Sequence, residues 1–186
     1  MTRFWLVRHA PTHAKCMIGW TDLPADLSDS AALQRLHQYL PEKAPVISSD
    51  LSRAVATADF LGRVRLPHDP DLREMHFGAW ETRSFAEIEA ETPELINAFW
   101  EHPGDVRPPG GESWNRLLAR SVTALKRLQG LAPDIIVVAH FGPILCALQT
   151  ALGISTEEAF AQRIDNLSVT SLSLTPAQTF EINYLP

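Results

Sequence analysis

Three short apolar runs, each followed by a stretch with helical periodicity, constrain the fold of this chain more than any other feature of its sequence. The runs span residues 4–7, 45–48 and 135–139. Such short, continuous apolar runs are typical of strands buried on both faces, as in a parallel sheet. Near the end of the chain, residues 168–174 and 179–184 alternate around Thr175-Pro176-Ala177-Gln178, which predicts an antiparallel hairpin. We therefore expect an α/β fold, a three-layer α/β/α sandwich around a mostly parallel central sheet with a C-terminal antiparallel hairpin.

Capping residues and helix-ending residues locate the predicted helices. Ser28 and Ser52 are predicted at helix starts, Pro93 suits a first turn, and Gly130 ends the longest helix. The predicted helices cover residues 28–40, 52–62, 84–91, 93–101 and 113–129, and a further helix follows Pro143. With 186 residues, no internal repeat and only one loop-rich stretch, over residues 102–111, the chain is expected to form a single domain, 1–186.

The charge balance excludes one broad class of partner. The chain carries 22 acidic and 16 basic residues, for a formal net charge of −6. This balance argues against a protein that holds nucleic acid or an anionic membrane by bulk positive charge. Only Lys15, Lys43 and Lys126 are lysines, so nearly all of the positive charge belongs to arginine.

Cysteine usage and apolar run lengths bear on the compartment. Cys16 and Cys146 form no CxxC pair and no disulfide framework, which favours a reducing compartment. No stretch approaches the ~20 apolar residues of a membrane span, and the apolar run near the N-terminus is too short for the core of a signal peptide. We therefore expect a cytoplasmic protein.

Cationic side chains follow all three predicted parallel strands. Arg8 and His9 come directly after the first strand, Arg53 lies in the first turn of the helix after the second, and His140 follows the third. Because the carboxyl ends of parallel strands share one edge of the sheet, these four side chains should meet in one cleft. Helix N-termini and planar guanidinium groups both suit phosphate. Each residue alone could be an ordinary surface charge or a satisfied histidine, but the four together predict an anion site.

A histidine among the arginines suggests chemistry beyond binding. A neutral imidazole nitrogen can attack phosphorus, and neighbouring arginines favour the neutral form. The sequence has no Walker-type GxxxxGK[ST] loop and no DxD-like acidic cluster for magnesium, so it does not point to nucleotide-dependent or metal-dependent phosphoryl transfer, and we expect no cofactor. His9 and His13 have a spacing that metal ligands on a helix can have. A zincin motif would need an acidic residue at position 10, where Ala10 stands.

A series of motifs runs through most of the chain in a fixed order. Their segments are Leu6-Val7-Arg8-His9-Ala10-Pro11-Thr12, Gly19-Trp20-Thr21-Asp22 with Leu27-Ser28, Ser49-Asp50-Leu51-Ser52-Arg53-Ala54-Val55-Ala56-Thr57-Ala58, Leu72-Arg73-Glu74-Met75-His76-Phe77-Gly78-Ala79-Trp80-Glu81, Gly110-Gly111-Glu112-Ser113 and Val137-Val138-Ala139-His140-Phe141-Gly142. In these motifs the chain resembles the histidine phosphatase superfamily, which includes the cofactor-dependent phosphoglycerate mutases.

The resemblance implies a role for each matching residue. His9 resembles the nucleophile that becomes phosphohistidine, and Glu74 resembles the general acid that protonates the leaving oxygen and then activates water. Arg8, Arg53 and His140 resemble the phosphate pocket, and Thr12, the last residue of the first motif, is also expected at the phosphate. The segment around residues 76–111 is expected to be variable in the family and to cover the substrate.

Several positions depart from the family pattern or leave a choice open. Ala10 replaces the usual glycine, Pro11 replaces the common Glu or Gln, and Lys15 falls where an asparagine often contacts phosphate. Glu81 is the rival of Glu74 as the catalytic carboxylate. The remaining candidates for substrate contact or specificity are Lys15, Trp20, Trp80, Trp100, Trp114, His76, His102 and Arg107, each of which could instead be a core or solvent-exposed residue.

The predicted function is hydrolysis of small phosphomonoesters through a phosphohistidine, as in a histidine acid-type phosphatase. The short chain and the form of the Glu74 motif are most similar to α-ribazole phosphatases and broad phosphomonoesterases, with α-ribazole 5′-phosphate as the leading named substrate. The alternative is a cofactor-dependent phosphoglycerate mutase. A non-catalytic phosphate-binding module is a third reading, which the presence of both His9 and Glu74 disfavours. The sequence does not fix the oligomeric state.

Overall fold

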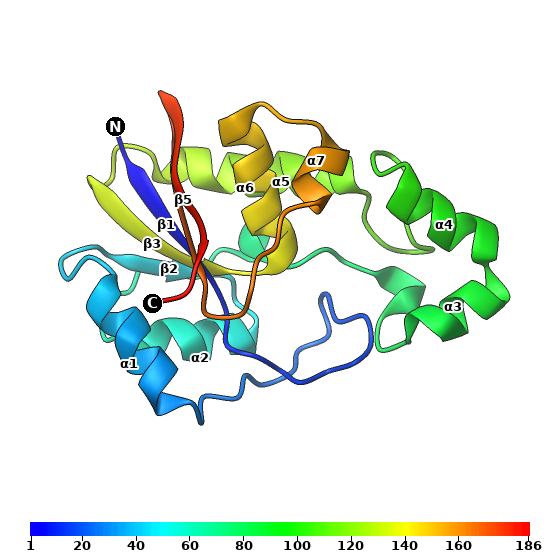
Figure 1. Ribbon diagram of the computed structural model, residues 1–186, viewed down its shortest axis with the longest axis horizontal. Coiled ribbons are helices and arrows are strands. Elements are labelled where there is room, and N and C mark those ends of the chain that lie inside the picture. Colours follow the sequence, from blue (N-terminus) through cyan, green and yellow to red (C-terminus); the bar gives the residue numbers. More distant parts are fainter.

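One five-stranded sheet forms the centre of the fold (Figure 1). The computed structural model describes residues 1–186. The strands are β1 (Arg3–Arg8), β2 (Val46–Ser48), β3 (Asp134–Ala139), β4 (Val169–Leu174) and β5 (Ala177–Tyr184), in the spatial order β2-β3-β1-β4-β5. β3 pairs in parallel with both β1 and β2, whereas β4 pairs antiparallel with β1 and β5. Four strands thus point the same way, and the predicted hairpin forms one edge.

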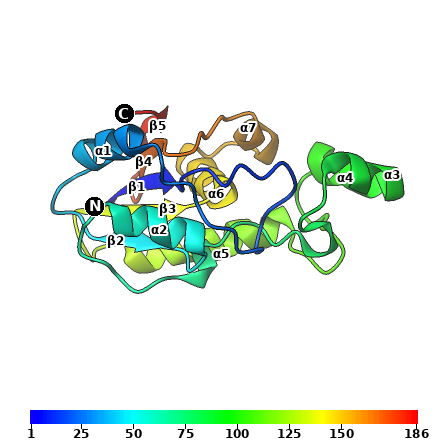
Figure 2. The same cartoon turned by 90° about the horizontal axis from the view of Figure 1, so that it is seen from below.

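Helices cover both faces of the sheet, which confirms the predicted three-layer architecture (Figures 1 and 2). The helices are α1 (Ser30–Tyr39), α2 (Ser52–Phe60), α3 (Phe85–Glu91), α4 (Pro93–Glu101), α5 (Trp114–Leu128), α6 (Phe141–Leu152) and α7 (Thr156–Phe160). In both views α3 and α4 lie beyond one end of the sheet. None of the helices has the length and apolar character needed to cross a bilayer.

Two apolar cores fill the space between the layers. Because side chains alternate along a strand, Leu6 and Val7 of β1 face opposite cores. The core on the Val7 side packs against Leu36 of α1 and Ala54 of α2. The core on the Leu6 side packs against α5 and α6 and extends to Phe99 of α4. The core on the Leu6 side therefore joins the sheet to α3 and α4 beyond its end.

The structure corrects the predicted start of the first helix. Ser28 does not cap it. Asp29 is the N-cap, and its Oδ1 accepts a hydrogen bond from the Ala32 amide at 3.0 Å. The Ser28 amide donates to Asp26 Oδ1 at 2.8 Å, so Ser28 belongs to the turn before the helix. An ionised aspartate directly before the first turn also interacts well with the helix dipole.

Three further differences concern short elements. Helix α6 begins at Phe141, so Pro143 lies in its first turn, where a missing amide hydrogen costs no helical bond. Strand β5 begins at Ala177 and not at residue 179, which leaves Thr175 and Pro176 alone as the turn. Helix α7 was not predicted, because a single turn and a half shows no useful periodicity.

Strand register sets the position of the site. Arg8 pairs with Ala139 and Ser48 with Val138, so the residues that follow leave the sheet side by side. The His9 amide still donates to the Ala139 carbonyl at 3.1 Å, and the Ser49 amide to the Val138 carbonyl at 3.3 Å. The carboxyl edge of the three parallel strands therefore carries His9, Ser49 and His140 together, as the strand-end pattern predicts.

Candidate active site

His9 lies in the buried turn after β1 with its two ring nitrogens in different environments. Nδ1 is 2.7 Å from the Ala10 carbonyl oxygen, and the side chain is almost completely buried. Because a carbonyl oxygen can only accept, Nδ1 carries the hydrogen and Nε2 keeps its lone pair. Burial lowers the pKa of His9 from 6.5 to about 3, against the Ala10 hydrogen bond and with help from the Arg53 and Arg8 charges. His9 is thus a neutral imidazole with a free Nε2.

The backbone around His9 is held from two sides. The Asn166 side-chain amide donates to the His9 carbonyl at 2.8 Å. The Ala10 amide donates to Thr57 Oγ1 at 3.0 Å, and the Thr57 hydroxyl donates to the Arg53 carbonyl at 2.7 Å. Thr57 therefore links the turn that carries His9 directly to α2, which carries Arg53.

Arg53 and Arg8 are fixed by backbone carbonyl oxygens. Arg53, at 1% exposure, donates through Nη2 to Gly19 at 2.6 Å and through Nη1 to Thr21 at 3.0 Å. Arg8 donates through Nη1 to Ile164 at 2.6 Å. Burial lowers the pKa of both guanidinium groups, while the charge of Glu74 raises it. Two cations are thus held in the interior next to a carboxyl group.

His140 completes the cluster. Its ring centroid is 4.9 Å from that of His9, and its Nε2 is 2.7 Å from Ser49 Oγ. Burial, together with the positive charges of Arg53, Arg120 and Arg8, lowers its pKa well below the usual value. Two buried nitrogens of this cluster, Arg8 Nε and His140 Nδ1, have no protein partner. Since unpaired buried donors are costly, these atoms fit an anion with several acceptor oxygens.

Glu74 brings a carboxyl group to the cationic cluster. Its Oε1 accepts hydrogen bonds from the Met75 amide at 2.9 Å and from the Gly142 amide at 3.0 Å, in the first turn of α6. Burial raises the pKa of Glu74, against those two bonds and the charges of Arg53 and Arg8. A Cβ at position 142 would lie 2.4 Å from Glu74 Oε1, so this close approach requires glycine.

Arg120, which the sequence analysis did not single out, holds the backbone that carries Glu74. Its guanidinium donates two hydrogen bonds to the Glu112 carboxylate, at 2.7 and 2.8 Å. Three more go to the carbonyls of Asp71, Arg73 and Glu74, at 2.7–2.8 Å. Glu112 Oε2 also accepts from the His76 amide. All five donors of one planar group are therefore used to shape the segment around Glu74.

Glu74 is expected from the sequence to protonate the leaving oxygen, and replacing Arg120 with lysine should weaken that step. A lysine has three donors in place of the five that the fixed fork supplies, so the Glu74 segment loses its alignment. We expect kcat/KM for ethyl phosphate to fall about tenfold or more, and that for p-nitrophenyl phosphate to fall less, because a good leaving group needs little acid assistance. Arg116→Lys, one turn earlier and exposed, is the matched control. An equal loss of kcat/KM for both substrates would mean that Arg120 has only a general structural role.

Glu81, the rival carboxylate, is engaged in local structure. Its two oxygens accept from the amides of Gly19, Trp20, Thr21 and Phe77 and from the Thr21 hydroxyl. Burial alone would raise its pKa, but the Thr21 hydroxyl and these amides lower it on balance. Glu81 therefore joins the Gly19 loop, which also holds Arg53, to the Glu74 segment as an ionised acceptor.

Replacing Glu81 with alanine should chiefly reduce stability. The change leaves the donors of the Gly19 loop without their acceptor, and we expect the free energy of unfolding to fall by about 2 kcal/mol. Urea denaturation measures this directly. Glu89→Ala on the exposed side of α3 should change it by less than about 0.5 kcal/mol. A Glu81→Ala protein of unchanged stability that has lost all turnover would make Glu81 the catalytic carboxylate.

The other predicted site residues fall in different environments. Trp20 is 38% exposed, and its Nε1 donates to the Glu74 carbonyl at 2.9 Å. Thr12 is half-buried, and its hydroxyl accepts only from the Ala14 amide, at 3.5 Å. Lys15 is exposed and forms no hydrogen bond or ion pair. Trp80 is a correction: at 2% exposure it packs in the core against Phe99, with centroids 5.3 Å apart, and is inaccessible to a substrate.

The remaining candidates divide between structure and surface. His13 is exposed and forms an ion pair with Asp26 at 2.7 Å, and no group of three or more possible metal ligands occurs in the chain. The His76 ring lies against Trp20, with centroids 4.5 Å apart and the ring planes tilted by 57°. His102 and Arg107 are exposed in and after the end of α4. Of the residues that sequence reasoning missed, Ser49, Thr57 and Glu112 lie inside the quoted motifs, whereas Arg120 and Asn166 lie outside them.

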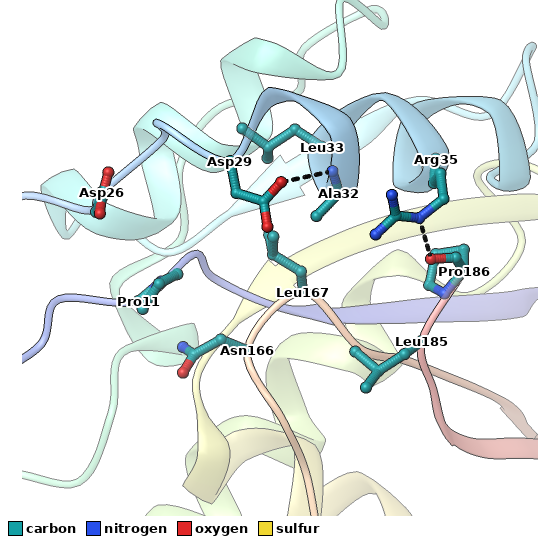
Figure 3. Close-up of a pocket in the computed structure, with 10 residues that line it drawn as sticks. All are labelled: Pro11, Asp26, Asp29, Ala32, Leu33, Arg35, Asn166, Leu167, Leu185 and Pro186. Carbon is teal, nitrogen blue, oxygen red and sulfur yellow. Dashed lines mark hydrogen bonds between the residues drawn. The ribbon is translucent and has the colours of Figure 1, made fainter.

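A separate cavity of about 290 Å³ lies behind the turn that carries His9 (Figure 3). Pro11 and Asn166 line it together with residues of α1 and the end of the chain. Figure 3 shows that the Arg35 guanidinium donates a hydrogen bond to the Pro186 carbonyl, at 2.9 Å. It also shows that the Asp29 carboxylate accepts one from the Ala32 amide. None of Arg8, His9, Arg53, Glu74 and His140 lines this cavity, so it is distinct from the cationic cluster.

The fold and the cluster define an α/β protein with buried cationic side chains at the carboxyl edge of its sheet and a neutral imidazole among them. The sequence profile of the histidine phosphatase superfamily (branch 1) matches residues 4–184. The chain belongs to this superfamily.

The chain is similar to members of this superfamily with different names. The adenosylcobalamin/α-ribazole phosphatase of Escherichia coli K12 is 29% identical over 174 residues, which are 88% of this chain and 85% of the relative. A probable phosphoglycerate mutase of Serratia proteamaculans is 29% identical over 185 residues, 93% and 84% of the two chains. The solved mycobacterial glucosyl-3-phosphoglycerate phosphatase superposes with a TM-score of 0.84 at 27% identity, over the full length of both chains.

Proposed function

We propose that this protein hydrolyses phosphomonoesters in two steps through a phosphohistidine at His9. The observation that carries the proposal is the neutral, buried His9 with a free Nε2, set among Arg8, Arg53 and His140. A binding module alone would gain nothing from a nucleophilic nitrogen at the centre of its anion site.

In the first step, His9 Nε2 attacks phosphorus and the bond between phosphorus and the leaving oxygen breaks. Glu74, whose raised pKa keeps it protonated at higher pH than an ordinary carboxyl group, gives its proton to that oxygen. The loose transition state spreads negative charge over three oxygens, and Arg8, Arg53 and His140 Nδ1 supply donors for them. The products are an alcohol, phosphohistidine and ionised Glu74.

In the second step, the Glu74 carboxylate takes a proton from water as the water oxygen attacks phosphorus. The bond between nitrogen and phosphorus breaks, inorganic phosphate leaves, and His9 and Glu74 return to their starting states. The same group thus acts as acid and then as base. The chemistry uses only residues of this chain, so the proposal includes no cofactor and no bound metal.

The proposed substrate is a small phosphorylated metabolite, with α-ribazole 5′-phosphate as the leading candidate. The name and extensive coverage of the Escherichia coli relative support this choice, and the Serratia relative supports phosphoglycerate mutase as the alternative. The proposal places the single-domain enzyme in the cytoplasm, without nucleic acid or membrane partners; two free cysteines support this compartment.

A substrate screen tests the proposal. The purified protein is incubated with p-nitrophenyl phosphate, α-ribazole 5′-phosphate and 3-phosphoglycerate, and released phosphate and 2-phosphoglycerate are both measured. Release of phosphate supports the proposal if the protein also carries a phosphohistidine. That adduct is stable in base and is lost in acid. Phosphate binding with no turnover of any substrate would favour the non-catalytic phosphate-binding module. Net formation of 2-phosphoglycerate would favour the phosphoglycerate mutase.

A further inference from the structure

An apolar hollow lies against Glu74, and we propose that it binds a flat aromatic part of the leaving group. The inference rests on the proposed function, because it needs Glu74 to face the leaving oxygen. It narrows the substrate to phosphomonoesters of alcohols that carry an aromatic ring.

Aromatic side chains from four separate segments form the hollow. Glu74 and Gly142 form its polar end, and Met75 and Leu117 contribute aliphatic surface. The aromatic lining consists of Phe77, Phe99, Trp100, Trp114, Phe141 and Phe160. Three of these six, Phe77, Phe99 and Trp100, come from the segment 76–111 that was expected to cover the substrate.

The hollow adjoins the reacting groups on the side of the leaving oxygen. The charge of Glu74 acts on Arg8 and Arg53 of the cationic cluster, and Glu74 also lines the hollow, so its carboxyl group is shared by the two. The Phe141 ring lies 5.5 Å from the Arg8 guanidinium, which is part of the cluster. An alcohol protonated by Glu74 must extend away from phosphorus past this carboxyl group, and the aromatic lining begins there.

The aromatic rings are held in a fixed frame. Phe99 and Trp100 meet edge to face at 4.9 Å and 84°, and Trp114 and Phe160 at 4.6 Å and 72°. The Trp114 Nε1 donates to Gln149 Oε1 at 2.9 Å, which fixes that indole. The hollow has a volume of about 50 Å³, well below the roughly 150 Å³ of a cavity that encloses a benzene ring. It therefore takes one edge of a flat ring, and the outer part of that ring rests on Trp100, which is 40% exposed at the rim. Such a ring gains edge-to-face contacts without reordering the lining.

The charge of the lining discriminates between leaving groups. Glu74 is the one ionisable residue among the ten that line the hollow, and none of them is a cation. A second carboxylate or phosphate on the leaving group would lose water there without gaining a partner, next to a carboxyl group that becomes negative in the first step. The hollow therefore favours an uncharged aromatic group over the carboxylate of 3-phosphoglycerate.

Matched alkyl phosphates test the wild-type preference. 2-Phenylethyl phosphate and ethyl phosphate have leaving alcohols of similar acidity, so their difference reports the ring and not the chemistry of the bond. We expect kcat/KM for 2-phenylethyl phosphate to exceed that for ethyl phosphate by about tenfold or more. Equal values, with both esters hydrolysed through phosphohistidine, would overturn the hollow as a subsite and leave the proposed function intact. Hydrolysis of neither ester, nor of p-nitrophenyl phosphate, would instead overturn the proposed function.

Substitutions at Trp100 test the location of the subsite. Trp100→Ala should reduce the ratio of the two kcat/KM values by about fivefold. Phe85→Ala, on α3 at 45% exposure and outside the hollow, should leave the ratio unchanged. Trp100→Arg should raise kcat/KM for 3-phosphoglycerate relative to that for 2-phenylethyl phosphate, a gain that misfolding does not produce. The ratio could stay unchanged in both Trp100 variants while their circular dichroism matches that of the wild type. That result would mean that the aromatic ring of the leaving group binds elsewhere.

Discussion

Replacing His9 with alanine is expected to lower turnover of p-nitrophenyl phosphate by about 10⁴-fold or more. The alanine protein has no nitrogen to attack phosphorus, so the two-step route is lost, while Arg8, Arg53 and His140 remain. Rapid acid-free quenching after incubation with a labelled phosphomonoester, followed by separation under basic conditions, measures the phosphohistidine. The alanine protein should carry none.

His13→Ala is the matched control for that experiment. His13 lies four residues further on but is exposed and paired with Asp26, so its loss should change turnover by about twofold or less. Label retained on the His9→Ala protein at the wild-type level would mean that another residue is the nucleophile.

Replacing Glu74 with glutamine is expected to lower kcat by about 10²- to 10⁴-fold for ethyl phosphate and by much less for p-nitrophenyl phosphate. Glutamine keeps the size of the side chain but has no proton to give to the leaving oxygen. Inorganic phosphate should still bind, since the cationic cluster is intact, and its inhibition constant measures this. Loss of phosphate binding would mean that Glu74 mainly organises the pocket.

The pH dependence of the same pair of proteins gives an independent check. Burial raises the pKa of Glu74, so the acid form persists to higher pH than in an exposed carboxyl group and is lost as the pH rises through the raised value. The wild-type profile of kcat/KM for ethyl phosphate should therefore fall on its basic side. The Glu74→Gln profile should lack that fall. His9, with a pKa of about 3, stays neutral from neutral pH down to about pH 4, so its protonation does not lower kcat/KM in that range.

The sequence was enough to predict the architecture and the cationic cluster, because both depend on local patterns. Buried parallel strands read as continuous apolar runs, and a cation at the end of each one must lie at the shared edge. The choice of Ser28 as a cap failed because Ser28 and Asp29 are both good caps, and the path of the preceding turn decides between them.

Residues that act across the fold were beyond the reach of the same reasoning. Arg120 looks like any charge on an amphipathic helix until the carbonyls of the Glu74 segment surround it. Trp80 and Trp100 have similar sequence surroundings, yet Trp80 packs against Phe99 in the core and Trp100 is 40% exposed at the rim of the hollow. Tertiary contacts, and not the neighbouring residues in the sequence, decide the roles of Arg120, Trp80 and Trp100.

The pairing of β1 with the distant β3 has a consequence for how the protein acquires its activity. The pairing of these strands brings together positions far apart in the sequence, such as Arg3 and Asp134, and the hydrogen bond from Asn166 to the His9 carbonyl spans 157 residues. Pairings of such high contact order close large loops and form slowly compared with helices. During refolding, helical circular dichroism should therefore recover before the affinity for phosphate. The return of phosphate binding would mark the moment at which the two ends of the chain have met.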